Sequence, residues 1–228
     1  MFILSRLDGV PPESFQNQIR QLVIDHVGEL SSVAITPDNP LYPLYQYGVG
    51  LEVHQYLQAM DGTRGLAVAL TLALDAEAPD QLRGFALTLP AQDDDQACVL
   101  AFLAVHPDHR RQGIARALLT DVQSRYACVE LNVFAGQVPW FEAMGLQVAA
   151  AAGPQVLMSS TGHASGALVG RLDIAPIYRT TEVRQIHAYL LKQHGDEAMM
   201  AAEKQRDERL DALALQAQAC VKQRKTVH

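Results

Sequence analysis

The hydrophobic and polar positions of the first 105 residues follow two periods, one typical of strands and one typical of helices. Four short apolar runs, each bounded by polar turns, predict β-strands at residues 1–7, 65–74, 82–90 and 97–105. Residues 11–30 predict an amphipathic helix, because apolar side chains recur there at helical spacing: Phe15, Ile19, Leu22, Val23 and Val27. Short polar turns join the last three runs, so we expect them to form an antiparallel meander.

The next stretch of chain continues the alternation of helix and strand. The pattern predicts helices at 51–60, 110–126 and 138–145, the last one ending at a C′ glycine, and strands at 128–134, 146–152 and 154–160. Residues 35–50 are aromatic and contain three prolines, so we expect them to be irregular.

The C-terminal residues differ from the rest in pattern and in charge. Residues 161–182 could hold one more strand, and helices are expected at 183–194 and 196–225, separated at Gly195. The second helix has a narrow apolar stripe, which must be buried against residues 1–160 or against a second subunit. Of the two we favour the second subunit, hence a homodimer through the C-terminal helices. The stripe consists of Leu210, Leu213, Ala217 and Cys220.

Composition narrows the class of protein. The chain has 228 residues, of which 49% are hydrophobic and 19% charged, enough for one substantial core. With no long apolar run and no signal-peptide pattern, we expect a soluble, cytoplasmic protein without membrane contact. Residues 1–180 contain ten Arg, no Lys and eighteen Asp or Glu, and this acidic body argues against a nucleic-acid partner. The three cysteines lack the spacing of a zinc site or a disulfide framework.

A possible anion site lies where the predicted strand 97–105 leads into the predicted helix 110–126. The unpaired N–H groups of a first helical turn attract an anion, and Gly113 would let a phosphate approach the backbone closely. Arg110 and Arg111 add positive charge suited to a diphosphate. Solvated arginines at an ordinary helix start are the alternative interpretation.

The surrounding sequence favours the anion site. Arg110-x-x-Gly113-x-Ala115, following "LAVHP", resembles the acyl-coenzyme A signature of the GNAT superfamily of N-acyltransferases. "VPWFEAMGL" at 138–146 is similar to a later segment of that family. The resemblance implies an α/β (α+β) fold with a mixed, mostly antiparallel central sheet flanked by helices. We therefore expect a GNAT-like domain at 1–160 and a linker with a C-terminal helical extension at 161–228.

The resemblance also implies an activity. We expect acetyl transfer from acetyl-CoA to an amine acceptor (a small molecule, peptide or protein) by direct attack in a ternary complex. A non-catalytic acyl-CoA-binding module that uses its helical tail for protein interaction is the alternative. The Val105 N–H would face the thioester carbonyl as the catalytic donor. Residues implied in cofactor binding are Leu103, Ala104, Val105, Arg110, Arg111, Gln112, Gly113, Ile114, Ala115, Arg116, Gln137 and Phe141.

Two positions depart from the family pattern, and the acceptor site rests on weaker signals. Phe141 stands where the family often has a tyrosine general acid, and Gln137 is the nearest counterpart of an asparagine that contacts coenzyme A. The acceptor side is expected at Tyr45, Tyr47 and Glu52, aromatic and acidic groups suited to an amine, although these tyrosines could simply pack a loop. No metal site is expected, since the pair His106 and His109 has no evident third ligand.

Overall fold

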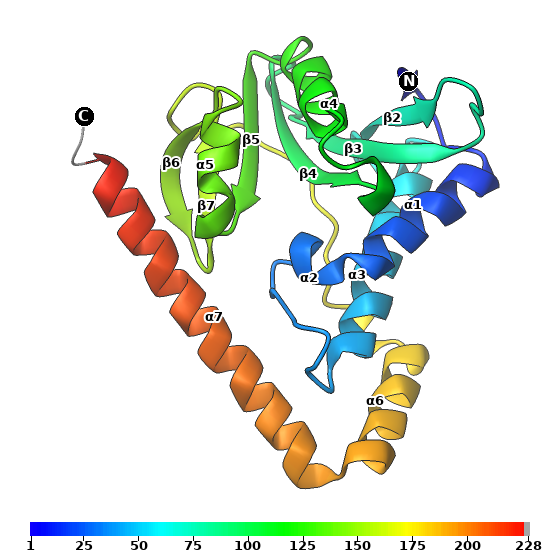
Figure 1. The fold of residues 1–228 in the computed structure, drawn as a ribbon, viewed down its shortest axis with the longest axis vertical. Helices are drawn as coiled ribbons and strands as arrows, with labels where there is room; N and C mark the ends of the chain where they lie inside the picture. Colours follow the sequence, from blue (N-terminus) through cyan, green and yellow to red (C-terminus); the bar gives the residue numbers. More distant parts are fainter. Residues whose placement is uncertain (226–228) are drawn as a thin grey trace.

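The computed structural model describes residues 1–225, and its central element is a single seven-stranded sheet (Figure 1). The strand order is β1-β2-β3-β4-β5-β7-β6, and all neighbouring strands are antiparallel except the parallel pair β4 and β5. The predicted mixed, mostly antiparallel sheet is confirmed. Its strands are β1 (Phe2–Leu7), β2 (Ala69–Asp75), β3 (Leu82–Pro90), β4 (Ala97–Val105), β5 (Cys128–Val133), β6 (Gln147–Ala152) and β7 (Gln155–Ser159).

Helices cover both faces of the sheet. The seven α-helices of residues 1–225 are α1 (Glu13–Asp25), α2 (Val27–Leu30), α3 (Tyr42–Ala59), α4 (Ile114–Gln123), α5 (Val138–Glu142), α6 (Thr181–His194) and α7 (Asp196–Lys225). Short 3₁₀ turns lie at η1 (Pro107–His109), η2 (Ala135–Gln137) and η3 (Ile177–Arg179). Among these described residues, no helix combines the length and apolar character needed to span a bilayer.

The central strands β2, β3 and β4 are largely buried on both faces, and a hydrophobic core lies on each side of the sheet. Successive residues of β3 point to opposite faces, and Phe85 therefore packs in the core of α1 and α3 whereas Ala86 packs in the core of α4 and α5. Both side chains are almost fully buried. This explains why the strands show near-continuous apolar runs in the sequence rather than a hydrophobic and polar alternation.

Two predicted helices have different bounds in the structure. The single helix expected at 11–30 is divided into α1 and α2 at His26, whose φ of −119° is not helical. Residues 35–50 are not irregular throughout, because α3 already begins at Tyr42. Pro43 lies in the first turn of α3, where its missing N–H costs no hydrogen bond. Gly48 is required by packing, since a Cβ there would lie 2.8 Å from the Tyr178 hydroxyl oxygen.

Residues 161–176 form no named strand. An isolated bridge joins Val169 to Ala91, and the extended segment is otherwise held to the body by individual hydrogen bonds. The Gln92 N–H donates to the Leu168 carbonyl at 2.8 Å, and the Leu172 N–H donates to the Tyr56 hydroxyl at 3.2 Å. The segment therefore crosses the body and delivers the chain to α6 (Figure 1).

Helix α7 connects the two cores of the same chain. Near its start, Met199 and Ala202 are buried in the core of α1 and α3, and near its end Ala217 and Cys220 are buried in the core of α4 and α5. The two contacts are about 22 Å apart along the helix. In Figure 1, α7 runs along one edge of the molecule from α6 to β6 and β7. The most buried part of the predicted stripe is thus covered within one chain. This removes the reason for which we favoured a second subunit.

Candidate active site

Strands β4 and β5 separate and open a cleft in the middle of the sheet. They pair only from Ala97 to Val99 of β4, whereas β4 continues beside β3 to Val105. The His106 N–H donates to the Arg83 carbonyl of β3 at 2.8 Å. Because backbone groups alternate in direction along a strand, the N–H groups of Leu103 and Val105 point away from β3 and into the cleft.

The loop before α4 presents free backbone N–H groups to the same cleft. Arg111 and Gly113 both have positive φ, at 61° and 80°, and Gly113 is the N-cap of α4 without any side-chain cap. This alternation of left-handed residues makes a concave N–H nest at the helix start. A Cβ at Gly113 would meet nothing within 4 Å, so the backbone here borders open space. An anion fits this arrangement.

A cavity of about 610 Å³ lies at this helix start. Its walls hold eleven of the twelve residues that the resemblance implied for the cofactor: Leu103, Ala104, Val105, Arg110, Arg111, Gly113, Ile114, Ala115, Arg116, Gln137 and Phe141. Gln112 does not line the cavity, because its side-chain amide turns toward the Asp108 carbonyl at 3.4 Å. Among residues 1–225, no three His, Cys, Asp or Glu side chains group together to hold a metal ion.

Arg110 ties the helix start to α2. Its guanidinium donates to both carboxylate oxygens of Glu29 at 3.3 and 3.1 Å, lies 3.2 Å from His26 Nδ1, and donates through Nε to the Val105 carbonyl at 3.3 Å. Arg110 is therefore already paired with Glu29, whereas Arg111 and Arg116 have no acidic partner among residues 1–225.

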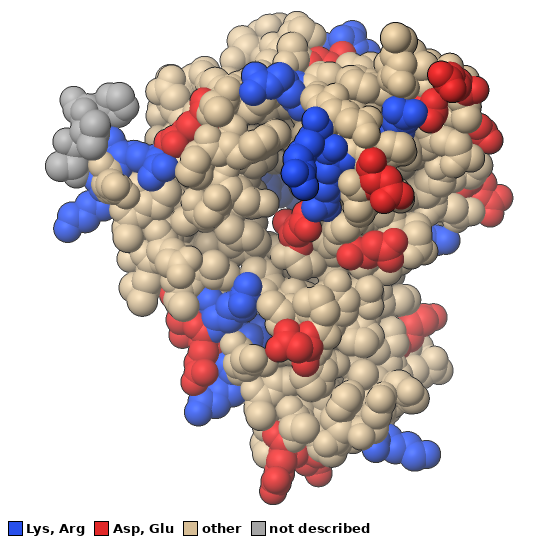
Figure 2. All heavy atoms as spheres, viewed as in Figure 1, with Lys and Arg blue, Asp and Glu red and all other residues tan. Residues whose placement is uncertain are grey.

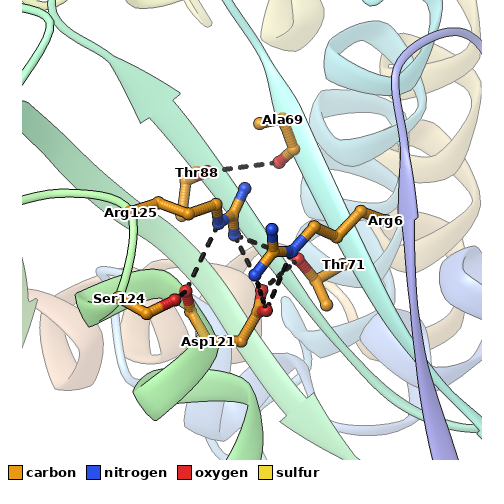
Figure 3. A network of polar contacts seen from close by, with 7 residues as sticks. All are labelled: Arg6, Ala69, Thr71, Thr88, Asp121, Ser124 and Arg125. Atoms are coloured by element: carbon orange, nitrogen blue, oxygen red, sulfur yellow. Dashed lines mark hydrogen bonds and ion pairs between the residues drawn. The ribbon is translucent and has the colours of Figure 1, made fainter.

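A partly buried polar network fixes α4 against the sheet (Figure 3). Asp121 of α4 accepts from Arg6 Nε of β1 at 2.9 Å, from the Thr71 hydroxyl of β2 at 3.0 Å, and from Arg125 at 3.1 Å. Burial opposes ionisation of this carboxyl, but these hydrogen bonds and charges outweigh it and lower the pKa of Asp121. The network holds the helix whose first turn borders the cavity.

Helix α5 supplies an aromatic wall opposite α4. Phe141 is 7% exposed and its ring meets the Trp140 ring edge-on, with centroids 4.6 Å apart. Both side chains line the cavity, and neither can exchange a proton with a ligand. Gln137 lines it too, while its side-chain oxygen accepts from the Phe134 N–H at 3.1 Å.

A second cavity of about 780 Å³ adjoins the first along β4. Val99 to Phe102 line it, Leu103 to Val105 line the first, and Leu30 of α2 borders both. Of the three residues expected on the acceptor side, Tyr45 and Glu52 line this cavity and Tyr47 does not. Tyr45, Val49, Glu52 and Tyr56 form one face of α3, at helical spacing. Figure 2 shows a hollow in the middle of the molecule, with blue Lys and Arg atoms at its rim.

Glu52 has an unusual electrostatic environment within this second cavity. Burial raises the pKa of its carboxyl to about 7, and the positive charge of Arg171 only partly opposes that shift. Among the described residues, none donates a hydrogen bond to this carboxylate. A carboxyl with a pKa near neutrality can accept and return a proton at physiological pH.

Several further polar residues line the second cavity and were missed in the sequence, among them Asn132, Arg171, Arg184, His187 and Arg206. Asn132 lies on β5 beyond the point where β4 and β5 separate, and the others come from the crossing segment, α6 and α7. The sequence did not indicate the arginines, because an arginine that lines a cavity and one on a solvated helix surface cannot be distinguished from sequence alone.

Comparison with known proteins identifies the domain. Residues 69–148, from β2 into β6 and including the helix start with its signature, match the model of the acetyltransferase (GNAT) domain. The chain carries a GNAT acetyltransferase domain. No curated protein matches the sequence. Residues 1–68 and 149–228 lie outside the matched range.

Solved structures share the GNAT fold at low sequence identity. An aminoglycoside 6′-acetyltransferase type Ii is 16% identical with a TM-score of 0.50, over 69% of this chain and 95% of its own. A spermidine N-acetyltransferase from Vibrio cholerae, solved with CoA and spermine, is 14% identical with a TM-score of 0.49, over 69% and 92%. PaiA N-acetyltransferase from Thermoplasma acidophilum, solved with coenzyme A, is 12% identical with a TM-score of 0.48, over 69% of this chain and 98% of its own. The likeness to the aminoglycoside 6′-acetyltransferase supports the fold, but at 16% identity it does not identify the acceptor of this chain.

Proposed function

We propose that the protein transfers an acetyl group from acetyl-CoA to an amine. One observation carries the proposal: the cavity at the uncapped start of α4 and the cavity that contains Glu52 adjoin along β4. Two substrates bound in them would meet beside one strand. The family to which the GNAT domain belongs supports an acyl-CoA donor.

The residues of the first cavity fit coenzyme A. The nest at Arg111 and Gly113 and the first N–H groups of α4 suit the diphosphate, with Arg116 and Arg111 adding charge. The pantetheine amides would bond the free backbone groups of β4. The N–H of Val105, or that of Leu103 two residues nearer to the second cavity, would stabilise the charge that develops on the thioester oxygen.

Glu52 is the base that the second cavity offers. Its carboxylate would take a proton from the substrate ammonium, and the amine nitrogen would then attack the thioester carbon. The carbon–nitrogen bond forms as the carbon–sulfur bond breaks, and the sulfur leaves with the electron pair. The second proton, which the nitrogen loses as the amide forms, ends on that sulfur and gives the free thiol of CoA. The first proton passes from Glu52 to solvent, which restores the carboxylate. Holding the amine beside the thioester contributes most of the remaining acceleration.

The absence of a phenolic group at Phe141 does not prevent this reaction. A thiol has a pKa of about 8.5, so the sulfur can leave without a general acid. Phe141 is nevertheless the feature that favours the alternative, an acyl-CoA-binding module without activity. The division into a GNAT-like domain at 1–160 and an extension at 161–228 stays a prediction.

Thiol release tests the proposal. The purified protein is mixed with acetyl-CoA and pools of small amines, amino acids and peptides, and free CoA thiol is followed together with acetylated product by mass spectrometry. We expect amine-dependent thiol release, reduced in Glu52→Gln. Binding of acetyl-CoA without amine-dependent release in any pool would contradict catalysis and favour the binding module.

A further inference from the structure

The cavity that contains Glu52 has more positive than negative charge. Its walls hold three guanidinium groups and one histidine, but only one carboxyl among the described residues, that of Glu52. Arg184 and His187 lie three residues apart on α6, and Arg206 lies on α7, which packs against α6. An acceptor that is only a cation would therefore meet net repulsion here.

Arg206 is held in place at the cavity wall. Its side chain is 25% exposed, Nη1 donates to the Tyr45 hydroxyl at 3.3 Å, and Nη2 lies 2.8 Å from the carboxylate of Asp207. Asp207 is 62% exposed and does not line the cavity, so the carboxylate paired with Arg206 lies outside the cavity that the guanidinium borders. Arg184 donates to two backbone carbonyls, of Thr180 and Arg179, and meets no carboxylate in the described residues.

Two hydrogen-bond acceptors without donors in the described part of the chain line the same cavity. Within residues 1–225, Asn132 Oδ1 is the one buried side-chain polar atom that has no hydrogen-bond partner. It borders the same cavity as Glu52, whose carboxylate also receives no hydrogen bond among these residues. A buried acceptor without a donor costs free energy, which a ligand N–H would recover.

We propose that the acceptor is a small amine that also carries an anionic group, a carboxylate or a phosphate. The arginines of α6 and α7 bind the anion, and Glu52 and Asn132 receive the amine. This inference rests on the proposed function, because it assigns the substrate class of the same site.

The geometry of α3 sets the length of this substrate. Tyr45, which contacts Arg206, and Glu52 lie seven residues apart on one face of α3, or about 10 Å along the helix axis. A linear chain of several carbon atoms between anion and nitrogen spans that distance. A cavity of about 780 Å³ accommodates such a molecule.

The first experiment compares matched amines as acceptors, again by thiol release. The ω-amino acids 5-aminopentanoate and 6-aminohexanoate and the corresponding aminoalkyl phosphates carry the anion, whereas pentylamine, hexylamine and 1,5-diaminopentane lack it. We expect kcat/KM to be at least tenfold higher for one anionic series. Preference for carboxylates over phosphates, or the reverse, then identifies the anion. Equal or better use of pentylamine, hexylamine or the diamine would overturn the proposal while leaving acetyl transfer intact.

Variants assign the anion site. Arg206→Gln and Arg184→Gln should raise the KM of the favoured anionic amine about tenfold, the usual worth of a charge-assisted hydrogen bond. The KM of hexylamine should not rise in either variant, because the lost guanidinium repels its ammonium group. Arg209→Gln is the matched control, because Arg209 is exposed on α7 and does not line the cavity. If Arg209→Gln had the same effect as Arg206→Gln, the loss would belong to α7 in general and the proposal would be wrong.

A binding arm separates this inference from the proposed function. Thermal denaturation without acetyl-CoA should show stabilisation by 6-aminohexanoate or an aminoalkyl phosphate, none by hexylamine, and a loss of the effect in Arg206→Gln. If no amine is acetylated but this pattern holds, the anion site stands and the catalytic proposal fails. If amines are acetylated but no anionic amine stabilises the protein, the anion site fails.

Discussion

The guanidinium of Arg206 donates a hydrogen bond of 3.3 Å to the hydroxyl of Tyr45, 161 residues earlier in the sequence. The pair joins α7 to the first turns of α3, in the wall of the acceptor cavity. At the other end of the same helix, Arg224 pairs with Glu142 of α5, next to Phe141 in the wall of the cofactor cavity. Helix α7 therefore contacts elements that form both cavities.

Ala217→Arg tests whether α7 is held by its own chain. Ala217 is fully buried against the sheet, so a larger charged side chain should destabilise the protein by about 1–3 kcal/mol from overpacking alone. Thermal denaturation measures the loss, and Ala219→Arg, on the exposed side of the helix, should have little effect. Light scattering should give the same mass for both variants and the wild type. A mass halved by Ala217→Arg alone would show that the stripe is a subunit contact.

Glu52 predicts the pH dependence of turnover. Burial raises the pKa of this carboxyl to about 7, and the base form must be present for catalysis, so kcat should fall as the pH drops below about 7. Glu52→Gln should lower kcat and abolish this limb. A pH profile measured between 5 and 9 checks the expectation. An unchanged limb in Glu52→Gln would assign it to another group.

Asp121 predicts the acid side of the stability profile. Its folded-state pKa lies below the ordinary 3.8, so its stabilising contribution is complete above that pH and is lost as the pH falls through the lower, folded-state value. Asp121→Asn should reduce the free energy of unfolding at pH 7 by about 1–3 kcal/mol. Urea denaturation at several pH values should show this difference shrinking below pH 3.8. A difference independent of pH would indicate a loss of packing instead.

Position 141 tests whether a general acid is needed. Phe141 lines the cofactor cavity, and a hydroxyl on its ring would point a donor into space that ligand or water fills. We expect Phe141→Tyr to be tolerated or to increase kcat, and the wild-type profile to show no alkaline limb due to a tyrosine. Loss of activity in Phe141→Tyr, with acetyl-CoA affinity retained, would mean that the apolar ring itself is required.

The cofactor side of the site could be predicted from the sequence because its signals are local. The strand β4, the turn with Arg110 and Gly113, and the helix α4 follow one another within thirty residues, and their apolar periods differ clearly. The structure gathers eleven of the twelve residues expected there around one cavity. Gln112 is the exception, since the left-handed residues on either side of it turn its side chain toward the Asp108 carbonyl.

The acceptor side could be predicted only in part, because tertiary packing builds it. Glu52 and Tyr45 share a face of α3, but the glycines and the proline of that helix suggested a loop. Gly48 is instead explained by its close packing against the distant Tyr178, and Pro43 by its place in the first turn of the helix. Arg206 reaches Tyr45 only through the course of the crossing segment and the turn at Gly195, which no short-range pattern reveals. The strand that residues 161–182 could have held is reduced to an isolated bridge at Val169, because individual hydrogen bonds replace a ladder there.

Titration calorimetry with acetyl-CoA on the wild type and on Gly113→Glu tests the placement of the cofactor most directly. The added carboxylate would enter the open space in front of the first turn of α4, where we place the diphosphate, and repel it. Gly62→Glu is the matched control, since Gly62 has a φ of 77° against 80° at Gly113 and equally open surroundings. We expect binding to the wild type and to Gly62→Glu, and none to Gly113→Glu. Equal affinity in all three proteins would contradict the diphosphate site at the start of α4.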